Sequence, residues 1–229
     1  MELKEIINSS SPLMERFKEV TPGTYNHCLA VASLAESIGR ELDVDNEMLV
    51  VSATLHDIGK CNNPMYFFEN LGDDQNPHDD FDPKISYQLI SRHVSDSVLR
   101  LVQLGMPSEV IHIVSEHHGD TLIKSIYQKA KDVYNGSTVE DHYRYKSVKP
   151  SSVSAAILMC ADVVESASRA MHNAGKLDDH KALVDTLINE LMDGEQLDIL
   201  KLGELRTIKN VLITEIKDMY HKRLDYDKE

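Results

Sequence analysis

The chain has 229 residues, of which 41% are hydrophobic and 27% are charged, a composition typical of a globular domain with its own core. Its formal net charge of -14 argues against binding along a nucleic-acid polymer, which requires a basic surface. No apolar run approaches the roughly 18 to 20 residues that cross a bilayer, and the start lacks a signal-peptide pattern, so we expect no membrane segment and a cytoplasmic location.

Helical periodicity dominates the first part of the chain, whereas the alternating pattern of strands is nearly absent. One helix is predicted over 27–42, where apolar residues recur on one face. A second is predicted from Asp45 to Asp57, just before a glycine that stops it. Asp82 and Pro83 have the order of an N-cap and a first-turn proline, which predicts a third helix after them.

The remaining elements are also predicted to be helical. Ser95 and Ser108 are expected to cap two further helices, the second ending at 117–119. The polar stretch 132–149 is predicted to be a loop, and the serines after Pro150 should open a long helix through SAAILMCADVVESASRAM. Two amphipathic helices follow, around LVDTLINELM and LRTIKNVLITEIKDMY.

Two features of the organisation concern function. The connection 60–82 is longer than the roughly 12 to 15 residues beyond which structureless loops are usually functional or disordered. Its four aromatic residues argue against disorder, so we expect a packed loop beside the active site. The chemistry is expected within 1–175. The C-terminal helices, within 176–229, should pack on the same domain or form a homodimer interface.

The first chemical signal is the adjacent pair His56 and Asp57 at the end of an apolar helix. By itself such a pair is more often a helix cap than a ligand pair. His27 and His93, however, lie on the apolar faces of the neighbouring predicted helices. A single buried histidine is usually a hydrogen-bonded core residue, but two that flank a His-Asp pair favour a metal site.

A second pair and a lone carboxylate add to this pattern. His117 and His118 precede Gly119, and both rings can face one centre at a helix end, although a pair favoured by the helix dipole is the alternative. Asp162 interrupts the apolar run AAILMCADVV. Because an unpaired buried carboxylate is costly, its partner should be either a metal ion or a buried cation such as Arg169.

These residues provide more donors than the four that a structural zinc site takes. They suit two divalent ions that share a bridging carboxylate. Imidazole and carboxylate ligands without thiolate favour iron or manganese, and the three cysteines are too widely spaced for a CxxC site. The candidate ligands are His27, His56, Asp57, His93, His117, His118 and Asp162.

In this order and context, the sequence resembles the HD-domain metal phosphohydrolase superfamily. Within it, the chain is most similar to the cytoplasmic domain of the seven-transmembrane HD (PgpH-type) cyclic di-AMP phosphodiesterases. The resemblance runs from Thr24 to Ala170 through TYNHCLAVASLA, LHDIGK, FFENLGDDQNPHDDFDP, EHHGDTLIKSIYQKA, YRYKSVKP and ADVVESASRA. It implies an all-α, HD-domain-like helical bundle with a dinuclear metal site in its core.

The resemblance also implies a division of the ligands between the two ions. One ion would be bound by His27, His56 and Asp162, the other by His93, His117 and His118, and Asp57 would bridge them. Two departures from the family are visible. The family's membrane-spanning and extracytoplasmic parts have no counterpart here, and 146–148 replaces a Pro-Gly-Pro-like stretch in a loop that is a candidate phosphate or base contact.

The expected reaction is the opening of cyclic di-AMP to pApA, with another cyclic dinucleotide or a dinucleoside polyphosphate as alternative substrates. Two ions about 3.5 to 4 Å apart would polarise the phosphoryl group and activate a bridging hydroxide for in-line attack. Asp57 and Lys60 are the expected catalytic residues. The candidate substrate contacts are Lys60, Tyr127, Arg144 and Lys149, for which core packing or solvated loop charge is the alternative.

Two functions of other classes are also compatible with the ligand pattern. A di-iron oxygenase ranks lower because the histidines at 93, 117 and 118 complete a second metal site, as expected of a phosphodiesterase. A nucleotide-binding module without turnover would be expected to lose ligands, whereas this sequence retains all seven.

Overall fold

This computed structural model describes residues 3–72 and 75–226, with side chains described as far as residue 220. Ten α-helices and five short 3₁₀ turns occur in these ranges, without a named strand, as the sequence predicts. The α-helices are α1 Leu3–Ile6, α2 Pro12–Val20, α3 Pro22–Glu41, α4 Asn46–Leu55, α5 Pro83–Gln103, α6 Ser108–Glu116, α7 Lys124–Val133, α8 Val153–Asn173, α9 His180–Asp193 and α10 Leu202–Tyr226. The 3₁₀ turns are η1 Ile58–Asn62, η2 Pro64–Tyr66, η3 Phe68–Asn70, η4 Pro77–Asp79 and η5 Glu140–Tyr143.

Several helices begin where the capping residues predict. The Asp45 carboxylate accepts hydrogen bonds from two first-turn amides of α4. At the start of α5, where Pro83 occupies the first turn, the Asp82 carboxylate accepts a hydrogen bond from the Lys84 amide. The Ser152 hydroxyl accepts from the backbone of α8. At the end of α6, Gly119 has a φ of 52°, which ends the helix as expected.

The prediction of a helix start at Ser95 is wrong. Ser95 lies in the middle of α5, where its hydroxyl donates to the carbonyl of Arg92 within the same helix. No glycine or proline interrupts the chain before Gly105, and the buried side chains of Val94 and Leu101 continue one face. Nothing in the local sequence therefore breaks the helix, and a serine alone does not start a new one.

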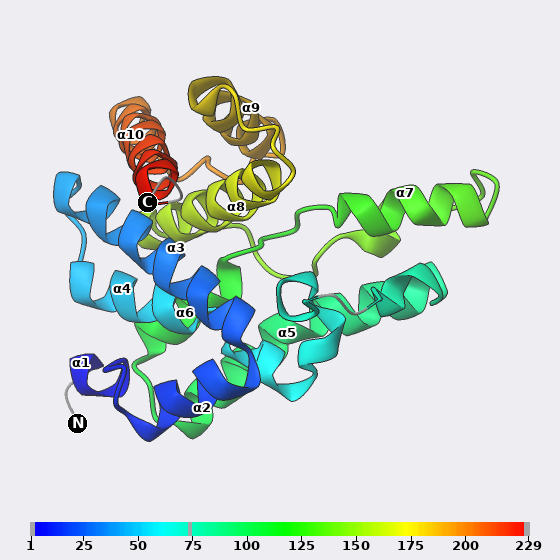
Figure 1. The fold of residues 1–229 in the computed structure, drawn as a ribbon, viewed down its shortest axis with the longest axis horizontal. Coiled ribbons are helices and arrows are strands. Elements are labelled where there is room, and N and C mark those ends of the chain that lie inside the picture. The colour runs from blue at the N-terminus through cyan, green and yellow to red at the C-terminus, as the bar shows by residue number, and fades with distance from the viewer. Residues whose placement is uncertain (1–2, 73–74, 227–229) are drawn as a thin grey trace.

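Helix α7 is an element that the sequence pattern did not reveal. It packs Ile126 and Ala130 against its neighbours and lies alongside the first half of α5, away from the rest of the molecule (Figure 1). A single ammonium group ties it to the connection 60–82. Lys129 Nζ donates to the carbonyls of His78, Asp79 and Phe81 at 2.5, 2.8 and 2.8 Å.

That connection is a packed loop, as expected, and it winds through the four turns η1 to η4. Phe67 is buried within it and meets the ring of His93 edge-on at 5.8 Å between centroids. The loop therefore lies beside the predicted ligands.

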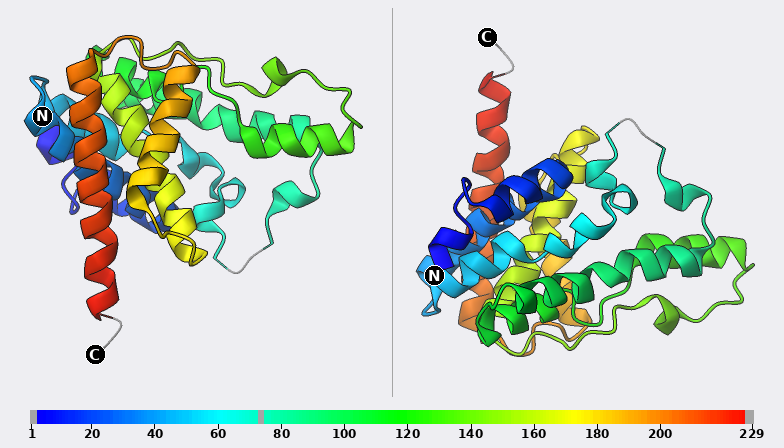
Figure 2. Two further views of the ribbon diagram at one scale, coloured as in Figure 1. Left: turned by 90° about the horizontal axis from the view of Figure 1, so that it is seen from above. Right: turned by 90° about the horizontal axis from the view of Figure 1, so that it is seen from below.

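The apolar core lies on both sides of the ligand-bearing segments. Helix α8 is fully buried over 155–161 and packs with α3, α9 and α10 in one cluster. A second cluster joins α2, α4, α5 and α6. Figure 2 shows α9 and α10 side by side, with the C-terminal end of α10 extending beyond the other helices. None of the described helices is long and apolar enough to cross a membrane.

Candidate metal centre

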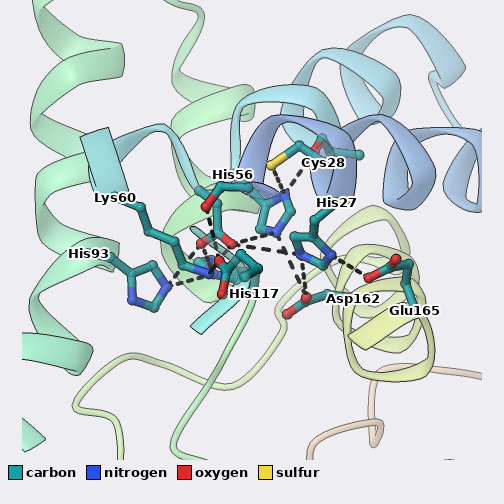
Figure 3. Close-up of polar contacts among 12 residues, drawn as sticks. His27, Cys28, His56, Lys60, His93, His117, Asp162 and Glu165 are labelled. Carbon is teal, nitrogen blue, oxygen red and sulfur yellow. Dashed lines mark hydrogen bonds and ion pairs between the residues drawn. The ribbon is translucent and has the colours of Figure 1, made fainter. Parts of the chain in front are cut away.

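The seven predicted ligands meet at one place in the interior. Figure 3 labels five of them: His27, His56, His93, His117 and Asp162. Helix α3 supplies His27, α5 supplies His93, and α8 supplies Asp162. The other four follow the ends of α4 and α6, where the chain leaves the helix. Six of the seven are buried, and the His118 side chain is 19% exposed.

The donors form two sets that share Asp57. We call His27, His56 and Asp162 the first set, following the division that the resemblance implies, and His93, His117 and His118 the second set. Asp162 lies near both, because its Oδ1 is 3.1 Å from His27 Nε2 and its Oδ2 is 3.7 Å from His118 Nδ1. Asp57 Oδ2 lies 3.7 and 3.4 Å from the Nε2 atoms of the two histidines in the first set. Its Oδ1 lies 3.2 Å from His93 Nε2 and 3.9 Å from His117 Nε2. One carboxylate thus presents a separate oxygen to each set.

Hydrogen bonds at the far side of the rings orient the histidines. The Nδ1 atoms of His56, His93 and His117 lie 2.8, 2.7 and 2.5 Å from backbone carbonyl oxygens three residues earlier in the chain. A carbonyl can only accept, so each Nδ1 carries the proton and donates it. The lone pair on Nε2 is then directed at the centre, which is the state that binds a metal.

His27 has a different partner. Its Nδ1 lies 2.5 Å from Oε2 of Glu165, which is 3% exposed and comes from α8 one turn after Asp162. Arg169 Nε donates to Glu165 Oε1 at 3.1 Å. The cation that the sequence offered as a partner for Asp162 is thus paired with Glu165.

The electrostatics of the cluster separate the two sets. Burial by itself would lower the pKa of His27, but hydrogen bonds to the carboxylates of Asp162 and Glu165 raise it to about 10. Burial lowers the pKa of His117 to about 3 and also lowers the pKa values of His93 and His118. Carboxylates together therefore have the larger effect on the pKa of His27, whereas burial has the larger effect on the pKa values of His93, His117 and His118.

The residues present fit a pair of divalent ions. His56 Nε2 and Asp57 Oδ1 are buried and have no hydrogen-bond partner within the described part of the chain. Buried polar atoms are rarely left in this way, and here both point into the donor cluster. Cys28 Sγ lies behind the His56 ring, 3.6 Å from Nδ1, so the centre itself is lined by nitrogen and oxygen donors.

Lys60 lies next to the bridging carboxylate. Its Nζ is 2.7 Å from Asp57 Oδ2 and 2.8 Å from Glu69 Oε1. Burial by itself would raise the pKa of Glu69, but the nearby ammonium lowers it to about 2. Glu69 in turn accepts a hydrogen bond from Thr24 of α3. Lys60 is thus a charged group held at the edge of the cluster.

A cavity of about 1030 Å³ opens from the cluster toward α9. Its buried end, here called the metal end, is lined by Asp57, Lys60, Phe67, His93, His118, Tyr145 and Asp162. Its exposed end, here called the α9 end, is lined by Lys124, Leu187, Glu190, Leu191, Asp193 and Gly194. The volume is at the upper limit of the range for small-molecule sites, which is about 1,000 Å³.

The predicted substrate contacts are divided by this cavity. Lys60 and Arg144 line it, and the Arg144 guanidinium donates to the Asp120 carbonyl at 3.0 Å and to Glu140. Tyr127 and Lys149 are not among its lining residues. Tyr127 packs in a small cluster with Tyr143. Lys149 Nζ lies 2.9 Å from Glu195 Oε2 and forms an ion pair with it.

Three residues at the site were not identified from the sequence. Glu165 has a signal in its spacing, because a residue three after a buried aspartate lies on the same helix face. Glu69 and Tyr145 have none. Tyr145 follows η5, stacks on the His118 ring with 4.2 Å between centroids and lines the cavity, a placement set only by the packing of its loop.

Known proteins are similar to this chain over nearly its whole length. The sequence profile of the family described as HD domain matches residues 24–167. The chain is 36% identical over 227 residues to the cyclic-di-AMP phosphodiesterase PgpH of Bacillus subtilis, covering 99% of this chain and 32% of that protein. It is 34% identical over 226 residues to the protein of the same name from Listeria monocytogenes, with 98% and 31% covered. The chain thus spans about a third of the length of these curated relatives.

A solved structure covers almost the same length as this chain. The crystal structure of the L. monocytogenes phosphodiesterase PgpH HD domain in complex with cyclic-di-AMP has a TM-score of 0.84 and 33% sequence identity. The match covers 93% of this chain and all of that chain. The structure of the same HD domain described without cyclic-di-AMP gives a TM-score of 0.83 and 32% identity.

Proposed function

This chain belongs to the HD domain family, and from that premise we propose that it is a metal-dependent phosphodiesterase that opens cyclic di-AMP to linear pApA. The observation that carries the proposal is the position of Asp57, whose two carboxylate oxygens face the two ligand sets separately. The choice of substrate is supported by the likeness to an HD domain whose structure was determined in complex with cyclic-di-AMP.

Two divalent cations, iron or manganese, would be held by the first and second sets with Asp57 between them. Bound there, they would supply Lewis-acid charge for the phosphoryl oxygens and a nucleophile at neutral pH. Nitrogen and oxygen donors without thiolate support this choice of metals. The backbone carbonyls and Glu165 fix the ring orientations, so that the donors need little rearrangement on binding.

The cavity residues would bind and orient the dinucleotide. Lys60 is placed to contact a phosphate oxygen next to the bridging carboxylate, while Glu69 holds its other side. Arg144 is the second charged contact that we propose. Phe67 and Tyr145 offer aromatic faces at the metal end, where a base can stack. Contacts of Lys149 and Tyr127 with the substrate remain predictions. Neither residue lines the cavity, so the structure does not support these two contacts.

The larger organisation is part of the same proposal. Residues 1–175 would form the catalytic part, and the helices within 176–229 would complete the same domain, because Ile208, Leu212 and Ile216 of α10 share the core cluster of α3 and α8. A homodimer through the C-terminal helices would cover Leu202, which is 78% exposed. The three free cysteines suit a reducing, cytoplasmic location.

The test is product analysis on purified protein loaded with iron or manganese. Cyclic di-AMP, other cyclic dinucleotides and a dinucleoside polyphosphate are incubated separately, and the products are identified by mass. We expect pApA from cyclic di-AMP at the highest kcat/KM. A higher kcat/KM for another nucleotide would replace the substrate, and oxygen consumption without ester cleavage would replace the reaction.

A matched pair of aspartate variants links this turnover to the centre. Asp57→Asn should abolish hydrolysis and lower the bound metal, because the bridging charge is lost. Asp96→Asn is the control, since Asp96 is also a buried aspartate but pairs with Arg92 and lines a separate pocket behind η1. Full activity of Asp57→Asn would contradict the proposed mechanism. Nucleotide that binds tightly to the metal-loaded protein and is recovered intact would indicate a binding module instead.

A further inference from the structure

We propose that the two ions bind in order, the first set filling before the second, and that Glu165 is the positioning residue that sets this order. The inference rests on the proposed two-metal function and adds to it a difference between the sites. Resemblance and ligand spacing treat the two sets alike. The contacts behind the ligands do not.

The groups that orient the rings differ in charge. In the second set, His93 and His117 donate their Nδ1 protons to neutral backbone carbonyls. In the first set, His27 donates to the Glu165 carboxylate, which is almost completely buried. A carboxylate behind an imidazole makes that ring a more basic and stronger ligand than a carbonyl does. His27, in the first set, is therefore expected to be a stronger ligand than the histidines whose Nδ1 donates to a backbone carbonyl.

The direct charges differ in the same sense. Asp57 is shared by both sets and pairs with Lys60, so it does not distinguish them. Asp162 lies between the sets but nearer to the first. Its Oδ1 lies 3.1 Å from His27 Nε2 and 3.8 Å from His56 Nε2, whereas its Oδ2 lies 3.7 Å from His118 Nδ1. The second set consists of three imidazoles. Since Coulomb interactions are strong in a buried site, the first ion gains most from the first set, where Glu165 and the nearer oxygen of Asp162 add negative charge.

Arg169 keeps Glu165 in place without cancelling this effect. Its Nε donates to Glu165 Oε1 at 3.1 Å from one turn further along α8, while Oε2 faces His27. The Arg169 side chain is 28% exposed, so water screens its charge more than that of the buried carboxylate. In contrast, the second set includes His118, which is the most exposed of the seven ligands and lines the open cavity. An ion held there exchanges more readily.

The test is a titration of the metal-stripped full chain with Mn²⁺. Binding is measured by calorimetry and by the electron paramagnetic resonance signal of the bound ion. We expect two steps in the unaltered protein, with an isolated Mn²⁺ signal at one equivalent and a coupled pair at two. Glu165→Gln keeps the shape but removes the charge. It should weaken the first step about 10- to 100-fold and leave the second almost unchanged, as loss of an outer partner does.

Three further variants keep the inference open to refutation. Glu116→Gln is the matched control, because Glu116 is a buried glutamate beside His117 whose carboxylate accepts from Ser151 instead of orienting a histidine. It should leave both steps unchanged. His118→Ala should lose the weak step and retain the tight one. If Glu165→Gln fails to fold, Arg169→Gln releases the same carboxylate and should weaken the first step by a smaller factor.

Several results would overturn the proposed order. These are two equal steps in the unaltered protein, an equal effect of Glu165→Gln on both steps, or loss of the tight step in His118→Ala. Hydrolysis of cyclic di-AMP is measured on the same samples, so that the two proposals are judged separately. Two ordered steps without hydrolysis would reject the proposed function alone, whereas hydrolysis with two equal steps would reject the order alone.

Discussion

The two ends of the cavity are built on different principles. At the metal end most side chains are buried, and the polar ones are held by specific partners, such as the carbonyl behind His93 and the ammonium beside Asp57. At the α9 end the walls include apolar leucines. The polar rim consists of Asp193 and an exposed pair in which Lys124 Nζ lies 2.6 Å from Glu190 Oε2. Side chains at the metal end are therefore held in place, whereas side chains at the α9 end can be substituted with little loss of stability.

This difference separates chemistry from specificity. Buried charges in a low-dielectric setting interact strongly and tolerate few substitutions, whereas exposed ion pairs contribute little. Substitutions at the metal end should therefore alter turnover and metal content, while those at the α9 end should alter mainly the KM for a given nucleotide. The predictions below test this division, beginning with the largest effect.

Removal of a ligand carboxylate should have the strongest effect. Asp162→Asn withdraws a buried charge that three histidines face, so kcat should fall by more than about 100-fold, the upper limit for loss of an outer partner. Bound metal, measured by elemental analysis, should fall with it. If kcat and metal content both remained at the level of the unaltered protein, the metal end would not be the site of chemistry.

Removal of the metal should destabilise the folded chain. An ion present at about 100 times its Kd stabilises the native state by about 2.7 kcal/mol, which corresponds to a Tm shift of about 5 to 10 °C at this chain length. A chelator should therefore lower the Tm of the metal-loaded protein, as measured by calorimetry. An unchanged Tm on complete removal of the ions would mean that the cluster is not where they bind.

The loop that carries Asp57 should tolerate no side chain at Gly59. A Cβ there would lie 2.4 Å from the His93 carbonyl oxygen and 2.4 Å from the Ser97 nitrogen, both backbone atoms of α5. Gly59→Ala should thus reduce the free energy of unfolding by about 1 to 3 kcal/mol, measured by urea denaturation. Gly203→Ala is the control, since a Cβ at Gly203 meets nothing within 4 Å. Equal free energies of unfolding for the two variants would contradict this prediction, because they would mean that η1 can move away from α5 without loss of stability.

Two basic residues of the same stretch should differ in their effect on substrate binding. Arg144 lines the cavity, whereas Lys149 pairs with Glu195 outside the lining. Arg144→Gln should raise KM about tenfold, equivalent to about 1.4 kcal/mol, with a smaller change in kcat. Lys149→Gln should leave both constants unchanged. A raised KM in Lys149→Gln, together with an unchanged KM in Arg144→Gln, would assign the phosphate contact to Lys149.

The smallest effect is expected at the α9 end. Lys124→Ala should change stability by less than about 1 kcal/mol, because the pair with Glu190 is solvent-exposed. Its effect on KM should be only a few-fold and should decrease with added salt. A large loss of kcat in steady-state assays would contradict the division between the two ends.

Much of the fold could be predicted because its signals are local. The cap at Asp45 and the Asp82-Pro83 start act through hydrogen bonds and dihedral angles within one turn, so the sequence alone places those helix ends. The same locality explains the error at Ser95. A serine is compatible with a cap or with a helix interior, and the choice depends on what the helix packs against.

The composition of the metal centre also follows from the sequence. Imidazoles and carboxylates on otherwise apolar helix faces are too costly to bury without a partner. His27, His93 and Asp162 could therefore be predicted from the sequence as candidate ligands, and all three are buried. The orientation of their nitrogen and oxygen atoms did not. That a carboxylate stands behind His27 and carbonyls behind the other rings was decided by how α8 packs on α3.

The sequence by itself thus determined an all-α chain and the chemical types of its seven candidate ligands, because helix periodicity and the cost of burying charge are properties of short segments. Only the tertiary structure decided which residues line the cavity, bringing Arg144 and Tyr145 in and leaving Lys149 out. The physical reason is that these positions depend on contacts between segments far apart along the chain, and no local pattern records the distance between two helices that meet only after folding.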